Sequence, residues 1–186
     1  MASLINWVYS VTTGTGLWFL KMTGLYTKKA NLLVIGLDNA GKTTLLGMLA
    51  NDKIGCHEPT SHPNHETLNI EGIEFSARDL GGHIAARRLW QSYYASTSCV
   101  LFMVDTTDIY RMGEARNELS RIIADLNGIP ILVLGNKIDT RDACSELQLR
   151  RYLNLYENEE NVGVFMCSVI KRAGIQEAFK WLATRI

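Results

Sequence analysis

The feature that most constrains the fold of this chain is the eight-residue string GLDNAGKT at positions 36–43. It fits the pattern GxxxxGK[ST], in which a glycine-rich loop joins a strand to a helix. An apolar, strand-like run at 32–35 precedes the string, and the stretch 42–50 places its leucines at helical spacing. Strand, loop and helix in this order predict the α/β fold of a P-loop NTPase.

The backbone of this loop matters as much as its side chains. Its glycines let N–H groups turn inward around phosphate oxygens, and the start of the following helix adds a favourable dipole. The Lys42 ammonium can reach the β- and γ-phosphates, and the Thr43 hydroxyl can bind Mg²⁺. We therefore expect the phosphates of a nucleotide to be bound by Asp38, Asn39, Ala40, Gly41, Lys42, Thr43, Thr44 and, further along the chain, Gly82.

The rest of the chain alternates between strand-like and helix-like stretches, after a polar loop expected at 55–66. Further strands are expected at 68–70, 73–77, 99–104, 129–134 and 162–166, with a turn at Glu71-Gly72. Helices are expected at 114–126, 145–155 and 175–182. This alternation predicts a six-stranded, mostly parallel sheet flanked by helices, with ligands bound at the carboxyl ends of the strands.

Composition argues against several other classes of protein. The 186 residues include 19 basic and 19 acidic side chains, so the net charge is zero and no nucleic-acid partner is expected. The four cysteines, at 56, 99, 144 and 167, form no CxxC pair, which excludes a zinc ribbon and favours reduced thiols. No apolar run approaches the roughly 20 residues of a membrane span. We also expect no secretory signal, no myristoylation at Ala2 and no prenylation.

The string GNKID at 135–139 follows a predicted strand and indicates which base is bound. The Asp139 carboxylate can accept hydrogen bonds from both N1–H and the exocyclic amine of guanine, a donor pair that adenine lacks. Asn136 would brace the neighbouring loops, and the stem of Lys137 would lie on the face of the base. Backbone at Ser168 and Val169, after the last strand, would contact the guanine carbonyl oxygen. The expected ligands are therefore GTP and GDP.

A catalytic residue is expected in the string DLGGH at 79–83. Gly82 leaves its N–H free to approach a γ-phosphate, and His83 stands where P-loop GTPases position the attacking water. An exposed loop histidine without a catalytic role is the alternative. No arginine is clearly placed to assist in cis, so intrinsic turnover should be slow. Arg87 and Arg88 are expected on a solvated or partner-facing helix surface.

Three residues are expected to hold Mg²⁺. Thr43 and Thr60 would bind it directly, and Asp79, at a strand end, would bind it through water. Thr60 lies in the loop after the first helix and would be ordered only when the γ-phosphate is present. Ser61 and Asn64 are polar neighbours of Thr60, so the sequence is less decisive there.

The first 37 residues contain no Asp or Glu and differ chemically from the rest. Large apolar side chains fall on one helical face and predict a membrane-binding amphipathic helix, formed by Leu4, Ile5, Trp7, Val8 and Val11. A helix packed on the folded domain is the alternative, and a switch could use both arrangements. We therefore divide the chain into a membrane-binding segment, 1–28, and a GTPase domain, 29–186.

Over nearly its whole length the sequence resembles Sar-type small GTPases, in the Arf/Sar branch of the Ras-like superfamily. The resemblance is carried by GLDNAGKTT at 36–44, PTSHP at 59–63, DLGGHIAARRLW at 79–90, GNKID at 135–139 and FMCSV at 165–169. It departs from the family at Glu58 and Asn64 and in a short stretch at 156–162. The histidine at 83 resembles Sar proteins more than Arf proteins, which carry glutamine there.

The resemblance implies a cycle between GDP and GTP forms and Mg²⁺-dependent GTP hydrolysis. It also implies assembly of the COPII coat on the cytosolic face of the endoplasmic reticulum, for transport to the Golgi. The implied partners are an exchange factor in that membrane and COPII inner-coat subunits, one of which is the activating protein and supplies an arginine in trans. Two alternatives stay open: an Arf-like GTPase at Golgi membranes, and a GTP-binding adaptor with negligible hydrolysis.

Overall fold

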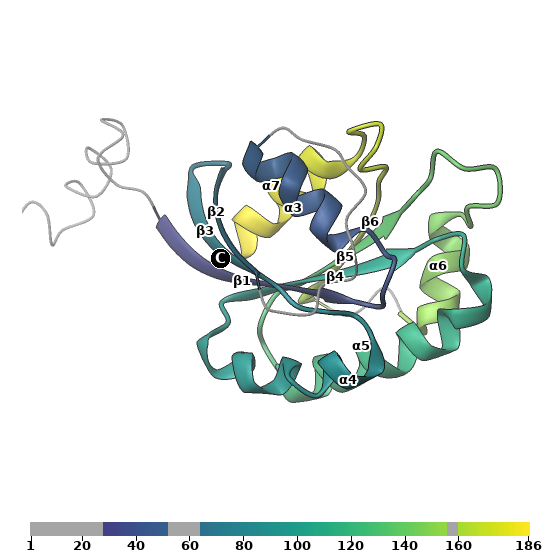
Figure 1. Ribbon diagram of the computed structural model, residues 1–186, viewed down its shortest axis with the longest axis horizontal. Helices are drawn as coiled ribbons and strands as arrows, with labels where there is room; N and C mark the ends of the chain where they lie inside the picture. The colour runs from purple at the N-terminus through teal and green to yellow at the C-terminus, as the bar shows by residue number, and fades with distance from the viewer. Residues whose placement is uncertain (1–27, 52–63, 156–159) are drawn as a thin grey trace, which may run out of the picture.

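A computed structural model describes residues 28–51, 64–155 and 160–186. Within them, six strands form one sheet in the order β2-β3-β1-β4-β5-β6 (Figure 1). The strands are β1 (Lys28–Gly36), β2 (Asn64–Ile70), β3 (Ile73–Asp79), β4 (Cys99–Asp105), β5 (Ile131–Asn136) and β6 (Val162–Met166). Neighbouring strands run parallel except β2 and β3, which form an antiparallel hairpin. The predicted six-stranded, mostly parallel sheet is confirmed.

The central strands are apolar throughout because helices cover both faces of the sheet. Every residue of β4 from Cys99 to Val104 is at most 3% exposed. The register aligns Val34 of β1 with Leu101 of β4, and Leu101 with Leu132 of β5. Such rows of buried aliphatic side chains fix the register, since a shift of one residue would exchange the two faces.

Two helical layers enclose the sheet. Helices α3 (Lys42–Asn51) and α7 (Ile175–Arg185) lie on one face, above the sheet in Figure 1. The other face is covered by α4 (Ile84–Arg87), α5 (Met112–Asp125) and α6 (Glu146–Leu153). Two 3₁₀ helices, η1 (Trp90–Ser96) and η2 (Ile109–Arg111), flank β4 in the chain. The loops at the carboxyl ends of β1, β3, β5 and β6 are left to form a site.

The largest error in the predicted elements concerns β2. The polar loop expected at 55–66 ends earlier, because β2 begins at Asn64. This strand lies at the edge of the sheet, where Leu68 is its one buried residue. Pairing with β3, which sets Asn64 opposite Asp79, holds its polar residues in the sheet. An edge strand of this kind lacks the apolar signal by which the other strands were predicted.

Smaller differences have local causes. The strand expected from 129 begins at Ile131, after Pro130, which has no N–H to give to the ladder. The helix expected over 145–155 begins after Ser145, whose hydroxyl and Gln148 form a capping box. It ends at Leu153 because Asn154 adopts a left-handed conformation with φ 58°. The 3₁₀ helices η1 and η2 were not predicted, and α4 was expected only as the helix surface that carries Arg87 and Arg88.

The cysteines that the structure describes are free thiols buried in the core, namely Cys99, Cys144 and Cys167. Burial raises the pKa of the Cys99 and Cys167 thiols to about 12. These thiols therefore stay protonated and behave as small apolar side chains, in agreement with the prediction of reduced cysteines. Cys56 lies outside the described residues.

Several predictions concern parts of the chain that the structure does not describe. They are the metal ligand Thr60 and the membrane-binding side chains Leu4, Ile5, Trp7, Val8 and Val11. The division of the chain into 1–28 and 29–186 is likewise untested, although Lys28 itself is described as the first residue of β1. They remain predictions. Among the helices of the described ranges, none has both the length and the apolar character required to span a membrane.

Candidate nucleotide-binding site

Three loops at the carboxyl edge of the sheet are joined by one side chain, Asn136 at the end of β5. Its Nδ2 donates a 2.9 Å hydrogen bond to the carbonyl of Ala40, in the loop between β1 and α3. Its Oδ1 accepts a 3.1 Å hydrogen bond from the N–H of Val169, beyond β6. The side chain is 4% exposed, so both bonds lie in a buried setting. Asn136 thus braces the loops, as the sequence predicts.

The loop predicted to bind phosphates, residues 36–43 and called the phosphate-binding loop below, has a backbone that few side chains would allow. Gly36, Asn39 and Gly41 have φ angles of 139°, 61° and 102°. A Cβ atom on Gly36 would lie 2.2 Å from the carbonyl oxygen of Met103 in β4. The loop therefore needs glycine at Gly36 both for its conformation and for its close approach to the neighbouring strand.

Lys42, the first residue of α3, is enclosed by this loop. Its ammonium donates to the carbonyls of Gly36 at 3.0 Å and Leu37 at 2.8 Å, and the residue is 6% exposed. Burial lowers the pKa of Lys42 to about 8, while the charges of Asp79 and Asp38 act in the opposite direction. A phosphate beside this ammonium would stabilise its charged form, which suits the predicted role in binding a polyanion.

A hydroxyl and a carboxylate meet beside the loop and fit the predicted metal. Thr43 Oγ1 donates a 2.6 Å hydrogen bond to Oδ2 of Asp79, which ends β3 and is fully buried. Oxygen donors of these two kinds are the ligands that Mg²⁺ prefers, and it commonly keeps waters between itself and a carboxylate. Thr43 and Asp79 could therefore hold Mg²⁺ here.

The predicted guanine-binding residues lie together after β5 and β6. The Ser168 hydroxyl donates to Asp139 Oδ1 at 2.5 Å, and this bond is the main reason that the pKa of Asp139 is lowered. Asp139 is exposed, and its carboxylate is thereby held ionised at the mouth of the site. Such a carboxylate can accept two N–H bonds from guanine.

Lys137 pairs with Asp105, a residue of the site that the sequence analysis missed. Its ammonium forms a 2.6 Å ion pair with Asp105 Oδ2, at the end of β4, and its φ is 74°. The pair fixes the direction of the lysine stem, which is predicted to lie along the base. An acidic residue directly after the apolar run 99–104 was the available signal for Asp105.

Gly82 packs against the phosphate-binding loop, and His83 follows it in the chain. Gly82 is buried, and a Cβ atom on it would lie 2.3 Å from Asp38 N and from Leu37 C. His83 is exposed and is the N-cap residue of α4, where its carbonyl accepts hydrogen bonds from the N–H groups of Ala86 and Arg87. His83 therefore directly follows the residue that packs against the loop, and its catalytic role remains a prediction.

The expectation that Arg87 lies on a solvated or partner-facing helix surface is wrong. Its side chain is 7% exposed, because carboxylates of α5 and the backbone of Gly82 surround the guanidinium. Arg88, its neighbour, is exposed as predicted. A short helix of four residues carries too little periodicity for the sequence to tell which of two adjacent arginines turns inward.

The sheet order, the phosphate-binding loop and the loops after β5 and β6 define a small GTPase of the P-loop class. The sequence profile of the ADP-ribosylation factor family matches residues 17–186. The chain belongs to this family.

Relatives within the family divide between two kinds. The small COPII coat GTPase SAR1 of Giardia intestinalis is 40% identical, over 91% of this chain and 98% of that protein. SAR1 of Nicotiana tabacum is 36% identical, over 98% of both chains. The ADP-ribosylation factor-like protein alp41 of Schizosaccharomyces pombe is 34% identical, over 90% of this chain and 91% of that protein. The predicted resemblance to the Arf/Sar branch is confirmed.

A solved structure gives the same class. The Arl6 (BBS3) small GTPase of Trypanosoma brucei, with the bound nucleotide analogue GppNp, superposes with a TM-score of 0.74 at 28% sequence identity. The match covers 84% of this chain and 96% of that one. This protein is therefore an Arf-family small GTPase, a class that binds guanine nucleotides.

Proposed function

We propose that this protein is a Mg²⁺-dependent switch that binds GTP and GDP and hydrolyses GTP slowly on its own. The observation that carries the proposal is the position of Asn136, which joins the phosphate-binding loop to the segment beyond β6. One side chain thereby holds the predicted phosphate site and the predicted guanine site in a fixed relation. Precise positioning of this kind is what phosphoryl transfer requires of a protein.

Each residue of the site has a distinct role in this proposal. The phosphates accept hydrogen bonds from the backbone N–H groups of Asn39, Ala40, Gly41 and Thr44. The Lys42 ammonium supplies a positive charge to the β- and γ-phosphates. Thr43, Thr60 and Asp79 hold Mg²⁺, which when bound offsets the negative charge of the β- and γ-phosphates. His83 orients the attacking water, and an arginine from an activating protein completes the charge stabilisation.

The catalytic assignment is tested with His83→Gly. We expect the variant to lose hydrolysis stimulated by an activating inner-coat complex, while its affinity for GTP stays close to that of the original protein. The matched control is His65→Ala, which replaces an exposed histidine on the edge strand β2. Equal turnover of His83→Gly and the unchanged protein would remove His83 from the mechanism. No turnover by any of them would favour the adaptor alternative.

We further propose that the switch starts COPII coat assembly on the endoplasmic reticulum. Its support is the set of SAR1 relatives at 35–40% identity over nearly the whole chain, together with His83. In this proposal the segment 1–28 inserts Leu4, Ile5, Trp7, Val8 and Val11 into the cytosolic leaflet in the GTP form. An exchange factor in that membrane would load the GTP, and inner-coat subunits would bind the loaded protein.

Sedimentation with liposomes tests the membrane and coat roles together. With a GTP analogue, we expect the protein to recover the inner-coat complex on liposomes, and with GDP we expect it not to do so. Deletion of residues 1–20 should lower recovery and leave nucleotide binding intact. Unaltered recovery after the deletion would contradict the anchor.

The second candidate is an Arf-like GTPase at Golgi membranes. It is favoured by Arf-like relatives at nearly the same identity, such as ADP-ribosylation factor K of Dictyostelium discoideum, which is 37% identical over 86% of both chains. The same sedimentation experiment distinguishes the two candidates. Membrane binding that depends on GTP but never recruits the inner-coat complex would favour the Arf-like role.

A further inference from the structure

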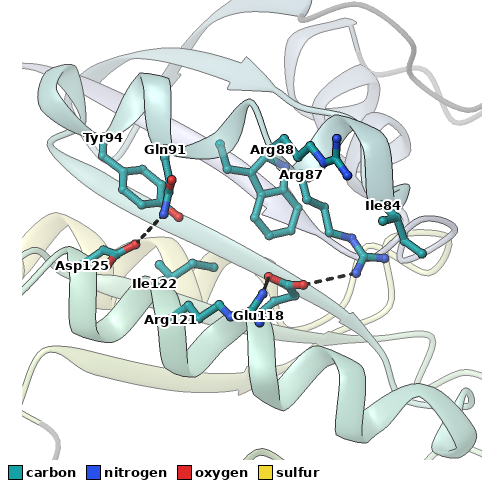
Figure 2. A pocket seen from close by; sticks show the side chains of 10 residues that line it. Ile84, Arg87, Arg88, Gln91, Tyr94, Glu118, Arg121, Ile122 and Asp125 are labelled. Carbon is teal, nitrogen blue, oxygen red and sulfur yellow. Dashed lines mark hydrogen bonds and ion pairs between the residues drawn. The ribbon is translucent and has the colours of Figure 1, made fainter.

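The Arg87 side chain forms hydrogen bonds with a backbone carbonyl and with two glutamates of another helix, although Arg87 lies in a short surface helix. Its Nε donates a 2.6 Å hydrogen bond to the carbonyl of Gly82, and its Nη1 lies 2.8 Å from Glu114 Oε1 and 3.4 Å from Glu118 Oε1. Both carboxylates belong to α5. Figure 2 shows the Arg87 side chain reaching towards Glu118 across the gap between the two helices. Arg87 thus ties the Gly82 backbone to a helix that is far from it in sequence.

The cluster extends to the phosphate-binding loop. Arg111 forms hydrogen bonds of 2.7 and 3.2 Å with the two oxygens of Asp38, and its Nε lies 2.8 Å from Glu114 Oε2. Nη2 of Arg87 lies 3.8 Å from Asp38 Oδ1. Glu114 therefore forms ion pairs with both Arg87 and Arg111, and Asp38 also pairs with both. The buried guanidinium of Arg87 is compensated by carboxylates on two sides, as a buried charge requires.

The hydrogen bond to Gly82 determines how one peptide group is turned. The carbonyl of Gly82 and the N–H of His83 belong to the same planar peptide and point in opposite directions. Fixing the carbonyl towards α5 therefore fixes the position at which the chain leaves Gly82 for His83. Gly82 is also packed closely against the phosphate-binding loop, since a Cβ on it would lie within 2.5 Å of backbone atoms of that loop.

From these contacts we infer that Arg87 is a positioning residue: by holding the Gly82–His83 peptide it keeps Gly82 in place for the terminal phosphate, and so favours GTP over GDP. The inference rests on the proposed function, in which the Gly82 N–H approaches the γ-phosphate. That N–H belongs to the Gly81–Gly82 peptide, whose carbonyl accepts a 3.1 Å hydrogen bond from Trp90 Nε1. Arg87 acts on it through the Cα of Gly82, which this peptide shares with the Gly82–His83 peptide. A diphosphate does not reach Gly82, so its affinity depends little on the state of this peptide. A triphosphate must order the peptide if Arg87 does not hold it, and that ordering weakens binding.

The test compares the affinities of the full chain for GppNHp and GDP in Mg²⁺, before and after single substitutions. Arg87→Ala removes the contact, and Arg87→Lys keeps a positive charge for Glu118 but cannot donate to Gly82 and both carboxylates in the same geometry. The matched control is Arg88→Ala, which removes an exposed arginine from the next position. Each variant is measured against both nucleotides, so the ratio of the two affinities is the readout.

We expect both Arg87 variants to lower the ratio of GppNHp to GDP affinity by about tenfold, the equivalent of about 1.4 kcal/mol. Affinity for GDP should change by less than about threefold, and Arg88→Ala should leave the ratio unchanged. A merely structural arginine would lower both affinities together, and that result would overturn the inference. So would an unchanged ratio in Arg87→Lys, which remains informative if Arg87→Ala does not fold.

Chemical rescue adds a second readout. Arg87 lines a groove of about 290 Å³ between α4, η1 and α5, which Trp90, Glu118 and Asp125 also line (Figure 2). Loss of its side chain would extend this groove, so added guanidinium chloride at millimolar concentration should restore part of the lost ratio in Arg87→Ala. No recovery there would contradict the inference. Failure of the unchanged protein to bind either nucleotide would instead contradict the proposed function.

Discussion

The side-chain amide of Asn136 donates a hydrogen bond to the carbonyl of Ala40, a residue 96 positions earlier in the chain. The same side chain accepts from the N–H of Val169. Since β1, β5 and β6 run parallel, their carboxyl ends meet at one edge of the sheet, and a single short side chain can bridge all three loops. The geometry of the proposed site is therefore a consequence of the strand order.

We predict that Asn136→Ala lowers both stability and nucleotide affinity. The substitution leaves the buried Val169 N–H and Ala40 carbonyl without their partner, which costs about 1–3 kcal/mol. Thermal unfolding and GDP titration measure the two effects. The matched control is Asn127→Ala, in an exposed turn. An Asn136→Ala protein with the melting temperature and affinity of the control would contradict the bracing role.

Asp139→Asn should exchange the preferred base. An amide cannot accept both N–H bonds of guanine, but it can donate to the second carbonyl of xanthine. Titration with GDP and with xanthosine diphosphate should show weaker binding of the first and stronger binding of the second. Asp142→Asn, a nearby exposed change, should do neither. An unchanged preference for guanine would mean that the base site is misplaced.

Gly82→Ala should impair binding of the triphosphate more than binding of the diphosphate. The added Cβ would meet the backbone of the phosphate-binding loop at 2.3 Å, so Gly82 must move away from the place where a terminal phosphate would lie. The matched control is Gly113→Ala, where a Cβ meets nothing within 4 Å and the helix α5 gains about 0.5–1 kcal/mol. Competition between GDP and GppNHp reports the difference, and an equal loss for both would count against this placement of Gly82.

The buried thiols give a prediction about pH. The pKa of Cys99 and Cys167 is about 12 in the folded protein, against an ordinary value near 9, so the folded state keeps protons that the unfolded state releases. The contribution to stability is complete below about pH 9 and is lost as the pH rises towards 12. Alkylation at pH 8, mapped by mass spectrometry, should modify these two cysteines only after unfolding. Rapid modification of the native protein would contradict their burial.

The elements that the sequence predicted well are those with the largest apolar content. The strand at 162–166 was predicted to the residue, and β4 differs by one residue at its end, because both are continuous apolar runs, although β6 is only partly buried at the edge of the sheet. Edge strand β2 was assigned in part to a loop, since its polar residues are held by pairing with β3 and carry no apolar pattern.

The candidate site was predicted from sequence motifs. The residues that the prediction missed are those whose role depends on tertiary contacts. Motif spacing identifies three parts of the site, namely the loop at 36–43, Asp79 and the string at 135–139. Each must present fixed groups to a phosphate or a base, so its residues occur at fixed spacing. Arg87, Arg111 and Glu114 carry no such pattern. The contact of Arg87 with Glu114 depends on how α4 packs on α5, and that of Arg111 with Asp38 joins residues 73 positions apart. Local periodicity does not contain that information.

The central claim is that a guanine nucleotide occupies the loops joined by Asn136, and calorimetric titration of the full chain in Mg²⁺ tests it most directly. The account predicts saturable heat at one site per chain with GDP and with GppNHp, and none with ADP at the same concentration. No heat with either guanine nucleotide, or equal heat with ADP, would contradict it.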